Sequence, residues 1–158
     1  MKWWLQAWLT AAALLAALPV AALDKGDPLV GRGRYLVQIG GCNDCHTPFY
    51  PMTGGNIPES EWLTGDNLGW RGIWGTTYAT NLRLFMHELS EEQWLKKARS
   101  LNARPPMSNS LQSMTDEDLR ALYRFVRVLG PAGKPAPKYV PPLMTPRGSY
   151  VQFPWIPM

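Results

Sequence analysis

Apolar residues recur with the period of an α-helix between residues 28 and 39. The residues that can share one face of this helix are Val30, Leu36, Val37 and Ile39. Asp27-Pro28 is typical of a helix start, because Asp caps the first turn and Pro fits its first position. Gly40-Gly41 is typical of a helix end. We therefore predict a helix from Pro28 to about Ile39. Gly33 lowers its helix propensity by roughly 1 kcal/mol relative to Ala, and a close helix crossing would explain that residue.

The clearest amphipathic stretch lies between residues 115 and 129. Its apolar side chains recur at i, i+3, i+4 and i+7, namely at Leu119, Leu122, Tyr123, Val126 and Leu129. Thr115 is a typical N-cap before an acidic first turn, and Gly130-Pro131 is a typical stop. A shorter helix is predicted from the capping box Ser90-Glu91-Glu92-Gln93 to about Ser100. We expect the last helix to be the packing partner of the first.

Neither a helical nor a strand period appears between residues 47 and 80, which are rich in Gly and Pro and interspersed with Trp. An irregular stretch of this length is unusual in a compact domain, unless the loop wraps around something apolar. From Pro131 onward the chain is Pro-rich, with aromatic residues scattered through it. We interpret residues 132–158 as an extended tail that lies over the domain or over a partner.

The N-terminal segment has the pattern of a targeting sequence. Lys2 precedes a nearly continuous apolar run, and Val20-Ala21-Ala22 supplies the small residues of a cleavage site. We interpret residues 1–22 as a signal peptide for export to the periplasm. The alternative is an uncleaved anchor, and only in that case do we expect membrane attachment. The formal net charge of +4, to which Lys2 contributes one unit, does not indicate nucleic-acid binding, but it favours docking to an acidic partner.

The two cysteines of the chain both lie in the string Cys42-Asn43-Asp44-Cys45-His46. A disulfide between them would close a very short loop and stabilise the fold little. A thioredoxin-like redox pair needs a strand before the first Cys, whereas a helical pattern precedes it here. A zinc site needs about four N or S ligands, and His87 is the only other histidine. Haem attachment accounts for the whole string, because each thiol can bond to a porphyrin vinyl group while His46 binds the iron.

The second axial position of the iron decides between electron transfer and reaction with small ligands. We predict Met107 as the distal ligand, because it lies in a loop that Pro105-Pro106 stiffens between two predicted helices. Met114 is the second candidate, although its place beside an N-cap is typical of a hydrophobic staple. The remaining candidates are Met52, Met86 and His87. We interpret His87 as a surface or loop histidine.

With these residues, the chain resembles the class I monohaem c-type cytochromes, particularly bacterial periplasmic cytochrome c domains associated with dehydrogenases. The resemblance spans roughly residues 28–131. It is carried by Gly33-Arg34-Tyr35-Leu36, the Cys-x-x-Cys-His-Thr string, Thr77-Tyr78-Ala79-Thr80-Asn81-Leu82, Pro105-Pro106-Met107 and residues 114–123. It implies an all-α, cytochrome c-like fold, with few short helices wrapped round a covalently bound haem and with long irregular loops. It also implies that the first and last helices cross, with Gly33 against the stripe around Leu119 and Tyr123.

The sequence thus predicts a periplasmic electron carrier and not an enzyme, with one covalent haem c. Cys42 and Cys45 are the predicted thioether residues, and His46 and Met107 the predicted axial ligands. The expected domains are the signal peptide 1–22, a cytochrome c domain 28–131 and the extension 132–158. Expected partners are redox proteins such as a periplasmic dehydrogenase or a terminal oxidase. Two alternatives stay open: a haem subunit bound permanently to a dehydrogenase, with the tail as its clamp, and an open-site haem enzyme or gas sensor.

Overall fold

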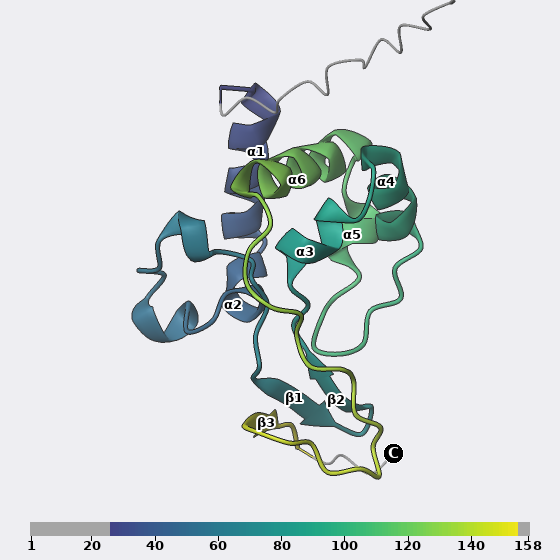
Figure 1. The fold of residues 1–158 in the computed structure, drawn as a ribbon. Coiled ribbons are helices and arrows are strands. Elements are labelled where there is room, and N and C mark those ends of the chain that lie inside the picture. The colour runs from purple at the N-terminus through teal and green to yellow at the C-terminus, as the bar shows by residue number, and fades with distance from the viewer. Residues whose placement is uncertain (1–25, 155–158) are drawn as a thin grey trace, which may run out of the picture.

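The computed structural model describes residues 26–154, so the predicted signal peptide lies outside the described residues. Longer helices gather in one half of the molecule and a small sheet lies in the other (Figure 1). The helices are α1 (Pro28–Ile39), α2 (Cys42–His46), α3 (Leu82–His87), α4 (Glu91–Arg99), α5 (Ser110–Ser113) and α6 (Asp116–Leu129), with short 3-10 helices η1 (Pro51–Thr53) and η2 (Glu59–Glu61). The strands are β1 (Gly69–Gly72), β2 (Gly75–Tyr78) and β3 (Tyr150–Gln152). No helix within residues 26–154 is both long and apolar enough to cross a membrane.

The three predicted helix starts are confirmed, and each is made by a side chain that binds a free backbone N–H group. Asp27 Oδ1 accepts a hydrogen bond from the Leu29 N–H at 2.9 Å. Thr115 Oγ1 accepts one from the Asp118 N–H at 3.1 Å. The capping box is reciprocal, because Ser90 Oγ accepts from the Gln93 N–H and Gln93 Oε1 accepts from the Ser90 N–H. Local chemistry therefore fixes where α1, α4 and α6 begin.

The crossing of α1 and α6 depends on Gly33. A Cβ atom at this residue would lie 2.0 Å from the Ala121 carbonyl oxygen and 2.7 Å from Phe125 Cβ. The predicted crossing is thus confirmed, but Ala121 and Phe125 form the contact. Leu119 and Tyr123 instead face the α3–α4 side, where the Leu119 carbonyl accepts from Trp94 Nε1 at 2.7 Å and the Tyr123 hydroxyl donates to the Leu89 carbonyl at 2.8 Å.

The hydrophobic core is built around α6, which packs against α1, α3 and α4, and part of the core comes from the Gly- and Pro-rich loop. Phe125 and Leu119 of α6 and Leu63 of the loop are among the largest fully buried side chains. Trp62 is also buried, and its ring packs edge-on against Phe125 with the ring centroids 6.4 Å apart. The loop between α2 and β1 is therefore held by its own apolar side chains.

The all-α prediction is wrong in one respect, because the described chain also contains a small three-stranded sheet of order β2-β1-β3. β1 and β2 form an antiparallel hairpin in which Gly69 lies opposite Tyr78 and Gly72 lies opposite Gly75. β3 pairs with β1 in parallel, with Gly69 opposite Tyr150. Strands this short, bounded by glycines, carry no alternating pattern, and one partner comes from the far end of the chain. The prediction that the segment 47–80 is irregular is therefore wrong for the two strands of the hairpin.

The described part of the tail lies along the hairpin and α3. Thr76 and Val140 exchange two backbone hydrogen bonds, of 2.7 and 3.0 Å. The Tyr139 hydroxyl donates to the Trp74 carbonyl at 2.8 Å. The Phe153 ring packs against Trp74, with the centroids 5.2 Å apart. These contacts, with those of β3, hold the tail to the body of the protein.

Candidate haem-attachment site

Helix α2 places both thiols and the imidazole of the Cys-x-x-Cys-His string on five consecutive residues. It follows α1 through Gly41, whose φ of 64° is in the left-handed region that glycine adopts without strain. Cys42 and Cys45 are half-buried free thiols. The chain thus turns sharply after α1 and presents both thiols without a disulfide between them.

The thiols of α2 do not have the electrostatics of a redox pair. Burial raises the pKa of the Cys42 thiol to about 11, and the charges of Asp44 and Cys45 act in the same direction. The pKa of Cys45 is also raised, first by burial and then by Asp44 and Asp66. Thioredoxin-like cysteines have lowered pKa values, because the thiolate is their reactive form. The structure therefore weighs against the disulfide-exchange alternative.

His46 is oriented by a backbone carbonyl from a distant part of the chain. Its Nδ1 lies 2.7 Å from the carbonyl oxygen of Thr80. A carbonyl oxygen can only accept, so Nδ1 carries the proton and Nε2 keeps a free lone pair. Burial lowers the pKa of His46, and the bond to Thr80 opposes this shift only in part. A neutral imidazole with a fixed tautomer is the form that binds a metal ion through Nε2.

The position of the Thr80 carbonyl is fixed on both sides. The Leu82 N–H donates to the Leu63 carbonyl at 3.0 Å. The Gly65 N–H donates to the His46 carbonyl at 2.8 Å, and the Asp66 N–H donates to the Ala79 carbonyl at 3.1 Å. A Cβ atom on Gly65 would lie 2.7 Å from the backbone nitrogen of Asn81, so these two segments approach as closely as glycine allows. Residues 63–66 therefore connect His46 to the segment 79–82, which follows β2 and contains the Thr80 carbonyl.

Asn81, which follows Thr80 directly, ties this region to the tail. Its side chain is buried, and Oδ1 accepts from the Leu84 N–H at 3.0 Å, which caps α3. Its Nδ2 donates to the carbonyls of Ala132 and Lys134 at 2.8 and 3.1 Å. One amide side chain therefore serves as a helix cap and as one of the points at which the tail is attached, beside the carbonyl that orients His46.

Two buried polar residues anchor α2 to the loop that follows it. Thr47 Oγ1 donates to Asn43 Oδ1 at 2.8 Å and accepts from the Leu63 N–H, also at 2.8 Å. Asn43 and Thr47 are each 1% exposed. The Asn43 Nδ2 atom is buried without a hydrogen-bond partner in the described structure. Asn43, one of the two residues between the cysteines, thus points inward and helps to hold α2 in place.

The predicted distal ligand Met107 lies in the loop between α4 and α5, where its side chain is 40% exposed. Thr77 Oγ1 donates to the Pro105 carbonyl at 2.5 Å, which fastens this loop to β2. Met114 packs against the core, and Met86 is buried within it. Met52 is almost fully exposed on η1. Met107 is therefore free of the core, in a loop attached to the strand that leads to Thr80.

The interpretation of His87 as a surface or loop histidine holds only in part, because this residue lies in a helix and is half-buried. It is the last residue of α3, and its Nε2 is buried without a hydrogen-bond partner in the described structure. Burial lowers its pKa, and the charge of Arg127 lowers it further. The sequence predicts no helix between residues 80 and 90, because α3 has only six residues and is too short to show a helical period.

Comparison with known proteins gives two relatives that cover most of the chain. The gluconate 2-dehydrogenase cytochrome c subunit of Pantoea cypripedii is 29% identical over 152 residues, which cover 82% of this chain and 32% of that protein. The chain is related to the cytochrome c subunits of dehydrogenases. The fructose dehydrogenase cytochrome subunit of Gluconobacter japonicus is 30% identical over 135 residues, which cover 73% of this chain and 27% of that protein.

The chain spans about a third of the length of the two curated proteins that it matches. No protein-family model matches it. No significant match was found among solved structures. Residues 26–154 contain no cluster of three or more His, Cys, Asp or Glu side chains that could hold a metal ion.

The residues of α2 fit a covalently bound haem. Attachment needs two free thiols and an imidazole nitrogen with an available lone pair, and α2 supplies all three next to one another. The sequence identified these residues by their spacing. It did not identify Thr80 as the orienting group, because a backbone carbonyl leaves no side-chain signal. Thr47 and Asn81 each lie within a segment that carries the resemblance, but no role was assigned to either of them from the sequence.

Proposed function

We propose that this protein binds one haem c through thioether bonds to Cys42 and Cys45 and uses it to transfer single electrons. The observation that carries the proposal is the 2.7 Å hydrogen bond from His46 Nδ1 to the Thr80 carbonyl, next to two free thiols. It leaves the Nε2 lone pair of His46 available, so His46 is our proposed proximal ligand. Cys42, Cys45 and His46 would hold the haem, and a haem held in this way would supply one-electron redox chemistry.

Met107 is our proposed distal ligand. Its thioether is free of the core, whereas Met114 and Met86 both pack against or within it. A thioether ligand raises the reduction potential and closes the iron to small molecules, which is the arrangement of an electron carrier. The hydrogen bond from Thr77 to Pro105 restrains the loop close to Met107. The rival function, an open-site haem enzyme or gas sensor, requires that no residue takes this position.

The proposed setting is the periplasm, with residues 1–22 as the signal peptide, 28–131 as the cytochrome c domain and 132–158 as the extension. The names of the relatives support a dehydrogenase as the electron donor. They say nothing of a terminal oxidase as the acceptor. The same names also support a second candidate function, in which the chain is a haem subunit bound permanently to a dehydrogenase. Both candidates share the same electron-transfer chemistry and differ only in how long the partner stays bound.

Absorption spectroscopy of the purified haem-loaded protein tests the proposal. A pyridine haemochrome spectrum typical of two thioether bonds is expected, and Cys42→Ala/Cys45→Ala should abolish covalent haem. The ferric protein should be low-spin and show the weak sulfur-to-iron charge-transfer band. Met107→Ala should remove that band and Met114→Ala should keep it. A high-spin ferric spectrum with rapid carbon monoxide binding in the unmodified protein would overturn the electron-carrier proposal.

A further inference from the structure

Three segments in the half of the molecule that contains the sheet carry charge of one sign only. They are the hairpin region 67–80, the loop 100–109 and the described tail 132–154. Their charged residues are all cationic, namely Arg71, Arg104, Lys134, Lys138 and Arg147. None of these five forms an ion pair with any described residue. The ion pairs of the described chain instead join α1, η2, α4, α6 and the α1 N-cap.

Specific contacts hold the three segments together into one surface, which we call the hairpin–tail face. The Arg104 guanidinium lies 4.1 Å from the centre of the Tyr139 ring, and Tyr139 in turn donates to Trp74 of the hairpin. Arg71 of β1 donates to the Met144 carbonyl of the tail at 2.9 Å. These cations are therefore held by rings and carbonyl groups, which leaves their charge uncompensated.

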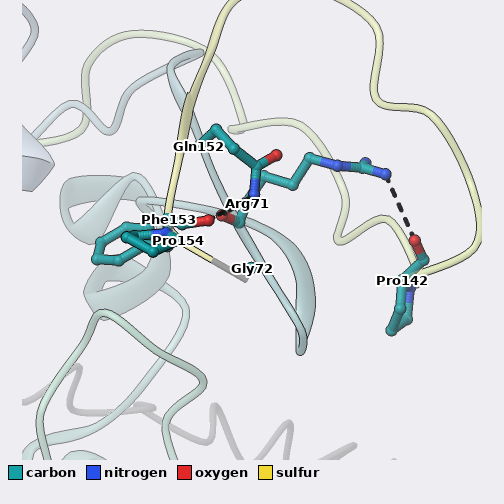
Figure 2. Close-up of a pocket in the computed structure, with 6 residues that line it drawn as sticks. All are labelled: Arg71, Gly72, Pro142, Gln152, Phe153 and Pro154. Carbon is teal, nitrogen blue, oxygen red and sulfur yellow. Dashed lines mark hydrogen bonds between the residues drawn. The ribbon is translucent and has the colours of Figure 1, made fainter. Parts of the chain in front are cut away.

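The same face exposes large apolar side chains between its cations. Leu143 is fully exposed, Met144 is 59% exposed, and Ile73, Tyr150 and Val151 are each about two-fifths exposed. An open pocket of about 470 Å³ hollows the face between β1 and the tail. Figure 2 shows the Arg71 side chain reaching across to Pro142 at one side of this pocket, with Phe153 at the other. Apolar and aromatic groups interleaved with arginine are typical of protein interfaces.

We propose that the hairpin–tail face is the docking surface for an acidic, partly apolar face of the donor dehydrogenase. The proposal rests on the electron-transfer function above and adds where the partner binds. Charge complementarity decides the occupant, because five unpaired cations with no acid among them attract a carboxylate-bearing surface. A second copy of this chain docked through the same face would bring like charges together, which opposes association.

The location also suits electron transfer. Arg104 stands three residues before Met107 in the loop that Thr77 fastens to β2. A partner seated on the hairpin–tail face would therefore rest against the loop that carries the proposed distal ligand. The prolines of the tail, among them Pro141, Pro142 and the buried Pro146, limit the conformational entropy that docking removes.

Zero-length carbodiimide cross-linking tests the proposal, because this reagent joins a lysine amine directly to a carboxylate. It would be applied to the haem-loaded protein mixed with the dehydrogenase purified from the organism that encodes the chain, and the joined residues would be mapped by mass spectrometry. We expect Lys134 or Lys138 to be joined to Asp or Glu of the dehydrogenase. Both lysines are exposed, and neither side chain makes a hydrogen bond or ion pair with a described residue.

A matched pair of charge reversals supplies the control. Lys134→Glu/Lys138→Glu should slow association with the dehydrogenase by about tenfold or more at low salt. Lys96→Glu/Lys97→Glu makes the same charge change on exposed, unpaired residues of α4 and should slow it by less than about twofold. Equal slowing by both pairs, or cross-links confined to Lys96 and Lys97, would overturn the proposed location.

Other outcomes overturn the proposed partner. Cross-links between two copies of this chain would make the face a self-association surface. Binding to vesicles of phosphatidylglycerol, lost in Lys134→Glu/Lys138→Glu, with no cross-link to the dehydrogenase, would make it a lipid-binding surface. Failure of the proposed function would be recognised separately, because the unmodified protein would then show no haemochrome spectrum. Neither charge-reversal pair touches the haem residues, so both variants should keep that spectrum.

Discussion

The close crossing of α1 and α6 makes a sharp prediction about two glycines of the same helix. Gly31 and Gly33 both lie inside α1, two residues apart. A Cβ at Gly31 would meet nothing within 4 Å, whereas one at Gly33 would lie 2.0 Å from the Ala121 carbonyl oxygen. Replacing either glycine by alanine brings the same gain in helix propensity. The difference between the two variants therefore measures the crossing alone.

The magnitudes follow from the two environments. Gly31→Ala should raise the free energy of unfolding by about 0.5–1 kcal/mol, because alanine is the better helix former by that amount. Gly33→Ala has the same gain, but a methyl group 2.0 Å from a carbonyl oxygen must push two backbones apart. Forcing an extra methyl into a packed core costs about 1–3 kcal/mol, and more where rigid backbone must move. We expect Gly33→Ala to lower the free energy of unfolding by about 2 kcal/mol or more.

Urea unfolding of the purified proteins, followed by far-ultraviolet circular dichroism, gives both values from midpoints and slopes. Thermal unfolding should show the same order, with the midpoint of Gly33→Ala lower by about 6 °C or more. The reasoning is refuted if Gly33→Ala is as stable as the unmodified protein, since α1 and α6 would then not cross at Gly33. It also fails if Gly31→Ala is destabilised to the same extent, because the cost would then lie within α1 itself.

Three further predictions concern the site and its surroundings. Asn81→Asp keeps the acceptor that caps α3 but loses the donations to Ala132 and Lys134. It should therefore lower the free energy of unfolding by about 1–3 kcal/mol and speed amide exchange in the tail, and unchanged exchange would contradict the attachment. Thr77→Val removes the hydrogen bond to the Met107 loop and should raise the affinity of the ferric protein for added imidazole about fivefold. An affinity equal to that of the unmodified protein would show that the loop is held by other contacts. The pKa of His87 is lowered in the folded state, so the unfolded chain takes up its proton first as the pH falls below the ordinary value of 6.5. Stability should accordingly fall from pH 7.5 to 5.5 in urea titrations, and less steeply in His87→Phe; an identical pH dependence in both proteins would exclude His87 as a source.

The sequence by itself determined the features that depend on neighbouring residues. The starts of α1, α4 and α6 were predicted to the residue, because a cap is a hydrogen bond between groups at most three positions apart. The candidate haem-attachment string could be proposed from the sequence for the same reason, since its chemistry is contained in five consecutive residues. The contact of α1 with α6 followed from one unfavourable glycine and one apolar stripe.

Only the tertiary structure decided the features that join distant parts of the chain. Thr80 orients His46 from 34 positions away, through a backbone carbonyl that every residue type possesses. β3 pairs with β1 although Gly69 and Tyr150 lie far apart in the sequence. Strands of three or four residues are also too short to show a periodicity of their own. The hairpin–tail face exists only because that pairing brings the cations of three segments together. Local chemistry therefore specified the candidate cofactor site, while long-range packing decided how its histidine is oriented and how the proposed docking surface is assembled.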